Sequence, residues 1–275
     1  MKIKFYGTRG SVPVSDPDFM VFGGNTTCLF ISGLDEGVGT VIMDAGTGIR
    51  NLGKDIMSKR IDIDKEINLG FTHFHWDHIQ GFPFFAPAYD ENSIIEISTA
   101  GKRKIVKLKD IFLTQMQSIY FPVQLENMGA QISFEKYGSN KFVGKKGALI
   151  SITEVNHPGG CIAVRFQVNK KSITFCTDLE HQNGIDDNVV QLAMNTDVLI
   201  HEAQYTDAEL KSHKGWGHSS YSQAIEVAER CNANQLIITH HDPDHDDEFL
   251  SRMEKKSQER IKDLVFARDN FELSF

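Results

Sequence analysis

The stretch that decides the fold is Thr72-His73-Phe74-His75-Trp76-Asp77-His78. Three of its residues are histidines and one is an aspartate, although only 11 of the 275 residues in the chain are histidine. In an extended backbone at a strand end, side chains two positions apart point the same way, so His73 and His75 project together. Asp77 and His78 then turn toward a neighbouring position. The spacing predicts one ligand pair for each of two metal ions, unlike the four-residue spacing of a helical zinc motif.

Three further candidate ligands each follow an apolar run. His157 precedes a Pro-Gly-Gly turn, Asp178 closes one predicted strand, and His240 closes another. Histidine and aspartate are both zinc-ligand types, and strand ends can bring distant residues together. The alternative is a polar loop whose histidines bind nothing. His241 is a second candidate at the last position, but the place directly after the strand favours His240.

Apolar runs bounded by glycine or polar residues predict strands in two groups. These runs cover about 2–6, 27–32, 40–44, 67–71, 94–98, 148–155, 161–168, 172–177, 198–201 and 236–239. Helices are predicted near 106–120, from about 220, and over about 247–267. Each group of strands is followed by helices. This order predicts an α/β fold, a four-layer αββα sandwich, as a single domain over residues 1–275.

The composition limits the compartment and the partner. The chain is 40% hydrophobic with a net charge of -8, which permits a large core and argues against wrapping a long nucleic acid. Four scattered cysteines predict buried thiols and no disulfide framework. No segment is long or apolar enough for a signal peptide or a membrane span. We therefore expect a cytoplasmic protein without a membrane partner.

The His-x-His-x-Asp-His run and the three later ligands closely resemble the metallo-β-lactamase superfamily, over nearly the whole chain. The resemblance implies a first metal held by His73, His75 and His157 and a second held by Asp77, His78 and His240. It also implies that Asp178 bridges both metals and that Asp44 orients ligands without binding metal. The expected cofactors are two divalent metal ions. Zn²⁺ suits these ligands best, and Mn²⁺ or Fe²⁺ also suits them.

Two shorter motifs, His201-Glu202-Ala203-Gln204 and Gly217-His218-Ser219-Ser220, resemble the signatures of the ribonuclease Z branch, as does the opening Gly7-Thr8-Arg9-Gly10-Ser11. The resemblance implies that Glu202 orients His218, which protonates the departing oxygen. A capping box of Ser220 and Gln223 predicts a helix just after His218. Asp77, Glu202 and His218 are the expected catalytic residues. The alternative is that Glu202 and His218 form a structural hydrogen bond.

The chain also departs from ribonuclease Z. That enzyme carries a long tRNA-gripping arm between the equivalents of His157 and Asp178, which here are only 21 positions apart. The missing arm and the acidic charge favour a small or cyclic phosphodiester, such as a cyclic nucleotide, attacked by hydroxide that the metals generate. The alternatives are a tRNA 3′ processing nuclease that docks through another surface, a metal-binding sensor without turnover, and a lactonase or thioesterase. Relatives of this branch are often homodimers.

Several residues near the expected site allow two interpretations. Arg9 is a candidate substrate contact, because an arginine fork suits two phosphate oxygens, and its alternative is an exposed loop charge. Trp76 is expected to pack beneath the ligand loop. An aromatic group could form a base-stacking wall, although core or dimer packing is favoured for it: Phe82, Phe84, Phe85 and Tyr89.

Overall fold

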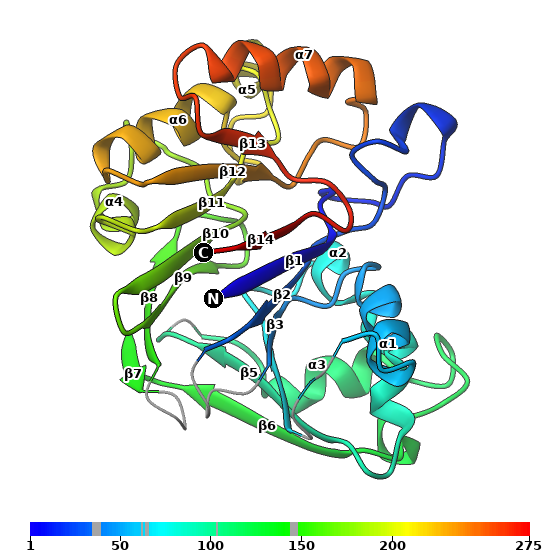
Figure 1. Ribbon diagram of the computed structural model, residues 1–275. Helices are drawn as coiled ribbons and strands as arrows, with labels where there is room; N and C mark the ends of the chain where they lie inside the picture. The colour runs from blue at the N-terminus through cyan, green and yellow to red at the C-terminus, as the bar shows by residue number, and fades with distance from the viewer. Residues whose placement is uncertain (35–39, 62, 64–65, 103, 144–147) are drawn as a thin grey trace.

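Two β-sheets pack face to face in the computed structural model (Figure 1), which describes residues 1–34, 40–61, 63, 66–102, 104–143 and 148–275. Among these residues each sheet has seven strands. The first has the order β14 (Glu272–Ser274), β1 (Lys2–Gly7), β2 (Cys28–Ser32), β3 (Val41–Met43), β4 (Glu66–Gly70), β5 (Ile94–Ala100) and β6 (Gln131–Tyr137). The second has the order β13 (Leu264–Phe266), β12 (Gln235–Thr239), β11 (Val198–Glu202), β10 (Lys171–Cys176), β9 (Cys161–Val168), β8 (Leu149–Val155) and β7 (Lys141–Val143).

The period of two along each strand divides its side chains between two apolar layers. In β2, Leu29 and Ile31 belong to the cluster between the sheets, whereas Cys28 and Phe30 belong to the cluster beneath the helices of the first sheet. In β10, Phe175 lies between the sheets and Cys176 lies in the cluster on the far side of the second sheet. Helices cover both outer faces, so the four-layer αββα prediction is confirmed (Figure 1).

The helices follow the sheets that they cover. On the first sheet lie α1 (Ile49–Met57), the one-turn α2 (Trp76–Ile79) and α3 (Leu108–Gln115). On the second lie α4 (Asp187–Ala193), α6 (Tyr221–Arg230) and α7 (Asp247–Gln258), with the short α5 (Asp207–Ser212) ahead of α6. The predicted capping box is present at α6: Ser220 accepts from the backbone of Gln223, and the Gln223 side chain accepts from Ser220. The four cysteines are buried thiols, as predicted.

Two predicted elements have the wrong extent. The charged helix predicted to reach Ala267 ends at Gln258, and Leu264–Phe266 forms the edge strand β13, paired in parallel with β12. The helix predicted near 106–120 is shorter, covering Leu108–Gln115. None of the helices in the described parts of the chain is both long and apolar enough to cross a membrane.

The carboxyl ends of several strands meet at one edge of the sandwich. β3 and β4 run parallel, and so do β10, β11 and β12. β8 also runs in the direction of β10, because each of them is antiparallel to β9. The loop after β1 joins the two sheets at this edge: Gly10 donates to the His241 carbonyl, and His241 donates to the Thr8 carbonyl. Residues that directly follow these strands are thereby brought to one place.

Candidate metal centre

The first cluster of candidate ligands contains His73, His75 and His157, whose ligand atoms all lie within 4.8 Å of one another. His75 Nδ1 is 3.0 Å from His157 Nε2. The Nδ1–H of His157 donates to the carbonyl of Gly217 over 2.8 Å, which fixes the ring and leaves Nε2 with a lone pair for a metal. Burial lowers the pKa of His73 and of His157, so both imidazoles are neutral, as a metal ligand must be.

The second cluster contains Asp77, His78, Asp178 and His240, which are all buried and also within 4.8 Å of one another. His240 Nε2 lies 3.2 Å from Asp77 Oδ2, and His78 Nε2 lies 3.3 Å from the same oxygen. Burial alone would raise the pKa of Asp77, but the two imidazoles hold that pKa well below its usual value. The second cluster therefore offers an ionised carboxylate to a cation.

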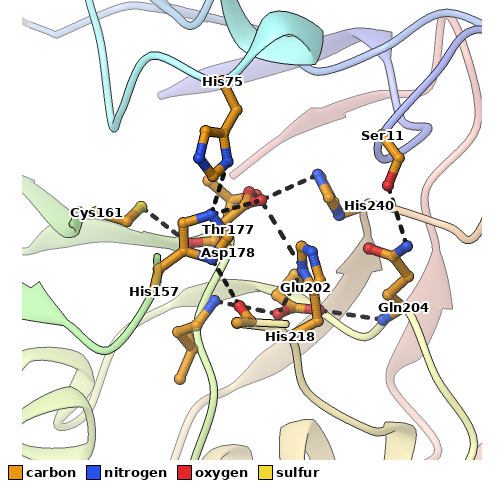
Figure 2. Close-up of polar contacts among 12 residues, drawn as sticks. Ser11, His75, His157, Cys161, Thr177, Asp178, Glu202, Gln204, His218 and His240 are labelled. Atoms are coloured by element: carbon orange, nitrogen blue, oxygen red, sulfur yellow. Dashed lines mark hydrogen bonds and ion pairs between the residues drawn. The ribbon is translucent and has the colours of Figure 1, made fainter. Parts of the chain in front are cut away.

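Asp178 lies between the two clusters (Figure 2). Its Oδ1 is 3.7 Å from His73 Nε2 and 3.9 Å from His157 Nε2. Its Oδ2 is 3.1 Å from His78 Nε2, and its Oδ1 is 3.4 Å from His240 Nε2. Asp178 thus lies within 4 Å of imidazoles from both clusters, the position from which one carboxylate would serve two cations.

The donor atoms fit divalent cations. Nε2 of His73 is buried and has no hydrogen-bond partner among the described residues, and Nε2 of His78 faces only the carboxylates of Asp77 and Asp178. A buried polar atom without a partner is costly unless something else binds it. Imidazole and carboxylate donors at this spacing are the ligands that zinc and similar divalent metals take.

Asp44 supports the ligands from behind, in the place that the resemblance implied. Its Oδ1 accepts the backbone N–H of Thr72, and its Oδ2 accepts both the Thr72 hydroxyl and His78 Nδ1, each over 2.8–2.9 Å. Because Nδ1 of His78 is used in this way, its Nε2 is left to face the cluster. Thr72 was not singled out from the sequence, although it immediately precedes the first histidine of the run.

Three of these residues have a left-handed backbone. Asp44, Asp178 and His240 have φ values of 61°, 53° and 60°, and each lies just beyond the carboxyl end of a strand. For a residue other than glycine this conformation costs about 1–2 kcal/mol. Such strain is typical of functional positions, where the side chain must leave the line of the strand. The chain turns at these three points, so that Asp178 and His240 face each other in the second cluster and Asp44 reaches His78 from behind.

Glu202 and His218 form an acid pair beside the second cluster (Figure 2). The Glu202 carboxylate accepts backbone N–H groups of Leu179, Ser219 and Gln204, and its Oε1 lies 3.5 Å from His218 Nδ1. Burial disfavours the imidazolium, but the hydrogen bond and charge of Glu202 outweigh burial and raise the pKa of His218 to about 9. Glu202 therefore favours the protonated form of His218.

The loop before His218 is held by a residue that the sequence did not reveal as functional. The buried carboxylate of Glu180 accepts the backbone N–H groups of Gly215 and Gly217 over 2.8–3.0 Å. The same loop presents the Gly217 carbonyl to His157. Glu180 lies two positions after Asp178, and this short distance along the chain was the one available signal.

The N-terminal loop reaches the site through its backbone and not through Arg9. Arg9 is fully buried, and its guanidinium donates to the carbonyls of Gly23, Asp242 and His245 over 2.7–2.8 Å. Both interpretations of Arg9, a phosphate contact and an exposed charge, are therefore wrong. The physical reason is that the loop passes between the two sheets, where the guanidinium fills the interior and joins three carbonyl groups.

Ser11, in the same loop, does reach a candidate ligand. Its backbone N–H donates to Asp77 Oδ2 over 2.9 Å. Gly10 passes so close to His240 that a Cβ there would lie 2.5 Å from the imidazole. The glycine permits this approach, which only a residue without a side chain allows.

Other expectations have mixed outcomes. His240 faces the second cluster, whereas His241 donates through Nε2 to the Ala267 carbonyl and packs against Phe266. Trp76 does not pack beneath the ligand loop: it is 66% exposed, because Asp77, His78 and Ile79 occupy the buried face of α2. In the aromatic group, Phe82 and Phe85 are core residues, while Phe84 and Tyr89 are partly exposed.

The family model described as "Beta-lactamase superfamily domain" matches residues 40–241. The chain belongs to the β-lactamase superfamily. Its matched residues include both clusters, Asp44, Glu202 and His218. Family, donor set and buried acid pair together make this member of the superfamily a metal-dependent hydrolase.

Similar proteins include ribonucleases and a diphosphatase. Ribonuclease Z of Lactococcus lactis subsp. cremoris (strain MG1363) is 22% identical, with 99% of each chain covered. The crystal structure of human tRNase Z, short form, has a TM-score of 0.69 at 19% identity and covers 100% of this chain and 99% of that one. A diphosphatase from the PhnP family has a TM-score of 0.68 at 17% identity, with 100% and 97% covered. At these identities the solved structures show a shared fold.

Proposed function

We propose that the chain is a two-metal phosphodiesterase that hydrolyses a small or cyclic phosphodiester, such as a cyclic nucleotide, with Zn²⁺ as the expected metal. The observation that carries the proposal is His218 within 3.5 Å of the buried Glu202 carboxylate, which favours its protonated form, beside two clusters of candidate metal ligands. Hydrolysis of a phosphodiester expels an alkoxide, which needs a proton. An acid pair next to a metal centre supplies that proton. A sensor without turnover has no use for such an acid.

His73, His75 and His157 would hold one cation, and Asp77, His78 and His240 the other, with Asp178 between them. When bound, the two cations supply Lewis-acid chemistry: they lower the pKa of water and offset charge on the attacked phosphate. The protein residues do the rest. Asp44 and the Gly217 carbonyl fix the imidazole rings, Glu202 keeps the proton on His218, and His218 gives that proton to the departing oxygen.

The segment between His157 and Asp178 supports a small substrate. It consists of a turn and the hairpin β9–β10, with two residues between the strands. The alignment with ribonuclease Z of L. lactis spans 322 positions against the 275 residues of this chain, so that relative contains residues that have no counterpart here. The net charge of -8 gives a long polyanion little general attraction.

The second candidate is a tRNA 3′ processing nuclease. Its support is the match to ribonuclease Z over 99% of both chains, and the same metal clusters and acid would cut either ester. This candidate needs a tRNA-binding surface outside the short β9–β10 segment. A homodimer and a cytoplasmic location stay predictions.

A substrate panel separates the candidates. Metal-loaded protein is assayed with a cyclic mononucleotide, bis(p-nitrophenyl) phosphate and precursor tRNA at matched concentrations. We expect turnover of the first two and little cutting of the third. Efficient 3′ cutting of precursor tRNA would favour the second candidate, and no turnover of any ester with Zn²⁺, Mn²⁺ or Fe²⁺ would favour a sensor.

His218→Ala tests the acid directly. We expect metal content to stay unchanged while kcat on a cyclic nucleotide, whose leaving alkoxide is poor, falls about 10²–10⁴-fold. The loss on bis(p-nitrophenyl) phosphate should be far smaller, because p-nitrophenolate departs without a proton. Equal losses on both substrates would show that His218 acts in some other way.

A further inference from the structure

The two tryptophans of the chain, Trp76 and Trp216, are both strongly exposed, with 66% and 60% of their surface accessible. An indole left in solvent gives up the free energy that its burial would contribute. Single exposed apolar residues are nevertheless common on protein surfaces. Their position relative to the metal centre is what distinguishes these two.

Both tryptophans adjoin residues that contact the same imidazole. Trp76 directly follows His75, whose Nδ1 lies 3.0 Å from His157 Nε2. Trp216 directly precedes Gly217, whose carbonyl accepts from His157 Nδ1 over 2.8 Å. The two segments that carry the indoles therefore meet at His157, one at each nitrogen of its ring and beside the first cluster, although they are far apart in the sequence.

The first cluster is where solvent reaches the centre. Within the two clusters, His75 is the exposed member, and the other six candidate ligands are buried. A substrate therefore approaches past His75. Trp76 is the next residue along the chain, and its side chain is exposed as well.

Trp216 is exposed but held in a defined orientation. Its ring packs edge-on against His213, with centroids 4.7 Å apart and an interplanar angle of 89°. His213 stacks on Tyr205 at 4.5 Å, and Tyr205 meets the ring of His218 at 5.9 Å. A chain of aromatic contacts thus runs from the acid to the exposed indole. An aromatic surface fixed before binding loses little entropy when a ligand stacks on it.

We infer that Trp76 and Trp216 form a stacking subsite for the planar base of a mononucleotide whose phosphodiester lies at the metal centre. The inference rests on the proposed function and names its substrate class. Stacking on an aromatic side chain suits any base, because every base has a π-face. A protein partner that covered both indoles would close the entrance at His75, whereas a mononucleotide occupies it as substrate.

The first test is direct binding, for which the two indoles are the reporters. Metal-loaded protein is titrated with adenosine 5′-monophosphate while tryptophan fluorescence is recorded, and ribose 5-phosphate serves as the control without a base. We expect quenching that saturates with the nucleotide and none with the sugar phosphate. The single variants Trp76→Ala and Trp216→Ala, each with one indole left, should bind the nucleotide at least about fivefold more weakly. Absent quenching, or equal quenching by both ligands, would overturn the subsite.

The second test compares two cyclic esters, cyclic AMP and the cyclic phosphate of glycerol. Either alanine variant should raise KM for cyclic AMP at least about fivefold and leave kcat/KM for the glycerol ester unchanged, while Trp76→Phe keeps most of the affinity. The matched control is Tyr120→Ala, an aromatic residue that is 67% exposed and is not adjacent to any ligand. We expect no change from it.

The outcomes separate the two proposals. Turnover of both esters with equal effects of the tryptophan variants on each would overturn the subsite and leave the phosphodiesterase proposal standing. A loss in Tyr120→Ala with none in the tryptophan variants would also overturn the subsite, by moving it to another surface. Failure to hydrolyse either ester would count against the phosphodiesterase proposal, and the fluorescence titration would still decide the subsite.

Discussion

At the scale of single residues, Glu202 is the residue of the acid pair that favours the protonated form of His218. The charge of the carboxylate raises the pKa of His218 to about 9 against the opposing effect of burial. The same carboxylate accepts three backbone N–H groups, which fix it in place without neutralising it. Glu202 is thus a positioning residue for a proton that the substrate receives from His218.

A pH prediction follows from this pair. An acid must be protonated to act, so turnover of a poor leaving group should persist below pH 9 and fall as pH rises through about 9. In Glu202→Gln the negative charge beside His218 is gone and burial remains, so the pKa of His218 should fall. The decrease of kcat at high pH, the basic limb of the profile, should therefore move to lower pH. The measurement is kcat against pH for a cyclic nucleotide, with metal content as the control. A limb that stays in place would exclude Glu202 as the cause of the raised pKa.

That the candidate ligand residues come together was largely predictable from the sequence, but the residues that support them were not. The histidine run and three strand ends are local patterns, and a residue directly after a strand is confined to the sheet edge. Arg9 and Trp76 were misplaced because their environment depends on how the two sheets and α2 pack. Glu180 went unseen because its partners are backbone N–H groups, which leave no trace in side-chain identity.

At the scale of elements, the loop between α5 and α6 offers a matched pair of glycines. Gly215 and Gly217 have φ values of 88° and 91°, so alanine is strained at both. A Cβ on Gly217 would lie 2.2 Å from His157 Nδ1, whereas a Cβ on Gly215 meets nothing within 4 Å. The two positions share the backbone cost and differ in contacts, because a Cβ on Gly217 would also lie 2.4 Å from Pro158, the residue after His157.

We therefore expect Gly217→Ala to lose metal from the first cluster and most activity, because His157 must move. Gly215→Ala should keep both metals and near-normal kcat and lose about 1 kcal/mol of stability, whereas Gly217→Ala should lose more than that because of the added clash. Metal analysis, activity and thermal unfolding measure these effects. Loss of metal in both variants would show that loop strain, and not displacement of His157, is responsible.

The elements themselves were predicted where a pattern is strong and local. The long apolar strands β8 to β12 lie close to their predicted bounds. The last helix was predicted too long, because the charged residues after Gln258 continue a helical composition while Leu264 and Phe266 pair with β12. Pairing of this kind joins residues about 30 positions apart, and a local pattern does not contain it.

At the scale of the whole molecule, the metal centre lies across the seam between the sheets. His73, His75, Asp77 and His78 follow β4 of the first sheet, and the other ligands follow β8, β10 and β12 of the second. A cation bound here joins two halves of the sandwich. Metal binding should therefore be coupled to the stability of the entire domain.

Removal of metal tests this coupling. At metal concentrations about 100-fold above Kd, each ion contributes about 2.7 kcal/mol to unfolding. Chelation should then lower Tm by roughly 10 °C or more for a domain of this size. Scanning calorimetry before and after chelation measures the change, and added Zn²⁺ should restore it. An unchanged Tm would mean that the halves are held together without help from the cations.

The left-handed backbone at Asp178 reverses the usual effect on stability of alanine and glycine at one position. Exchanging alanine for glycine usually weakens a protein, since glycine gains more freedom when the chain unfolds. With φ at 53°, however, the methyl group of alanine crowds the neighbouring carbonyl, and glycine escapes that clash. Both Asp178→Ala and Asp178→Gly should lack metal and activity. The glycine variant should nevertheless have the higher Tm, with a free energy of unfolding about 1 kcal/mol larger than that of the alanine variant. An aspartate moved to the position before or after Asp178 should therefore not replace it. The left-handed backbone at position 178, as well as the carboxylate itself, determines where the ligand points.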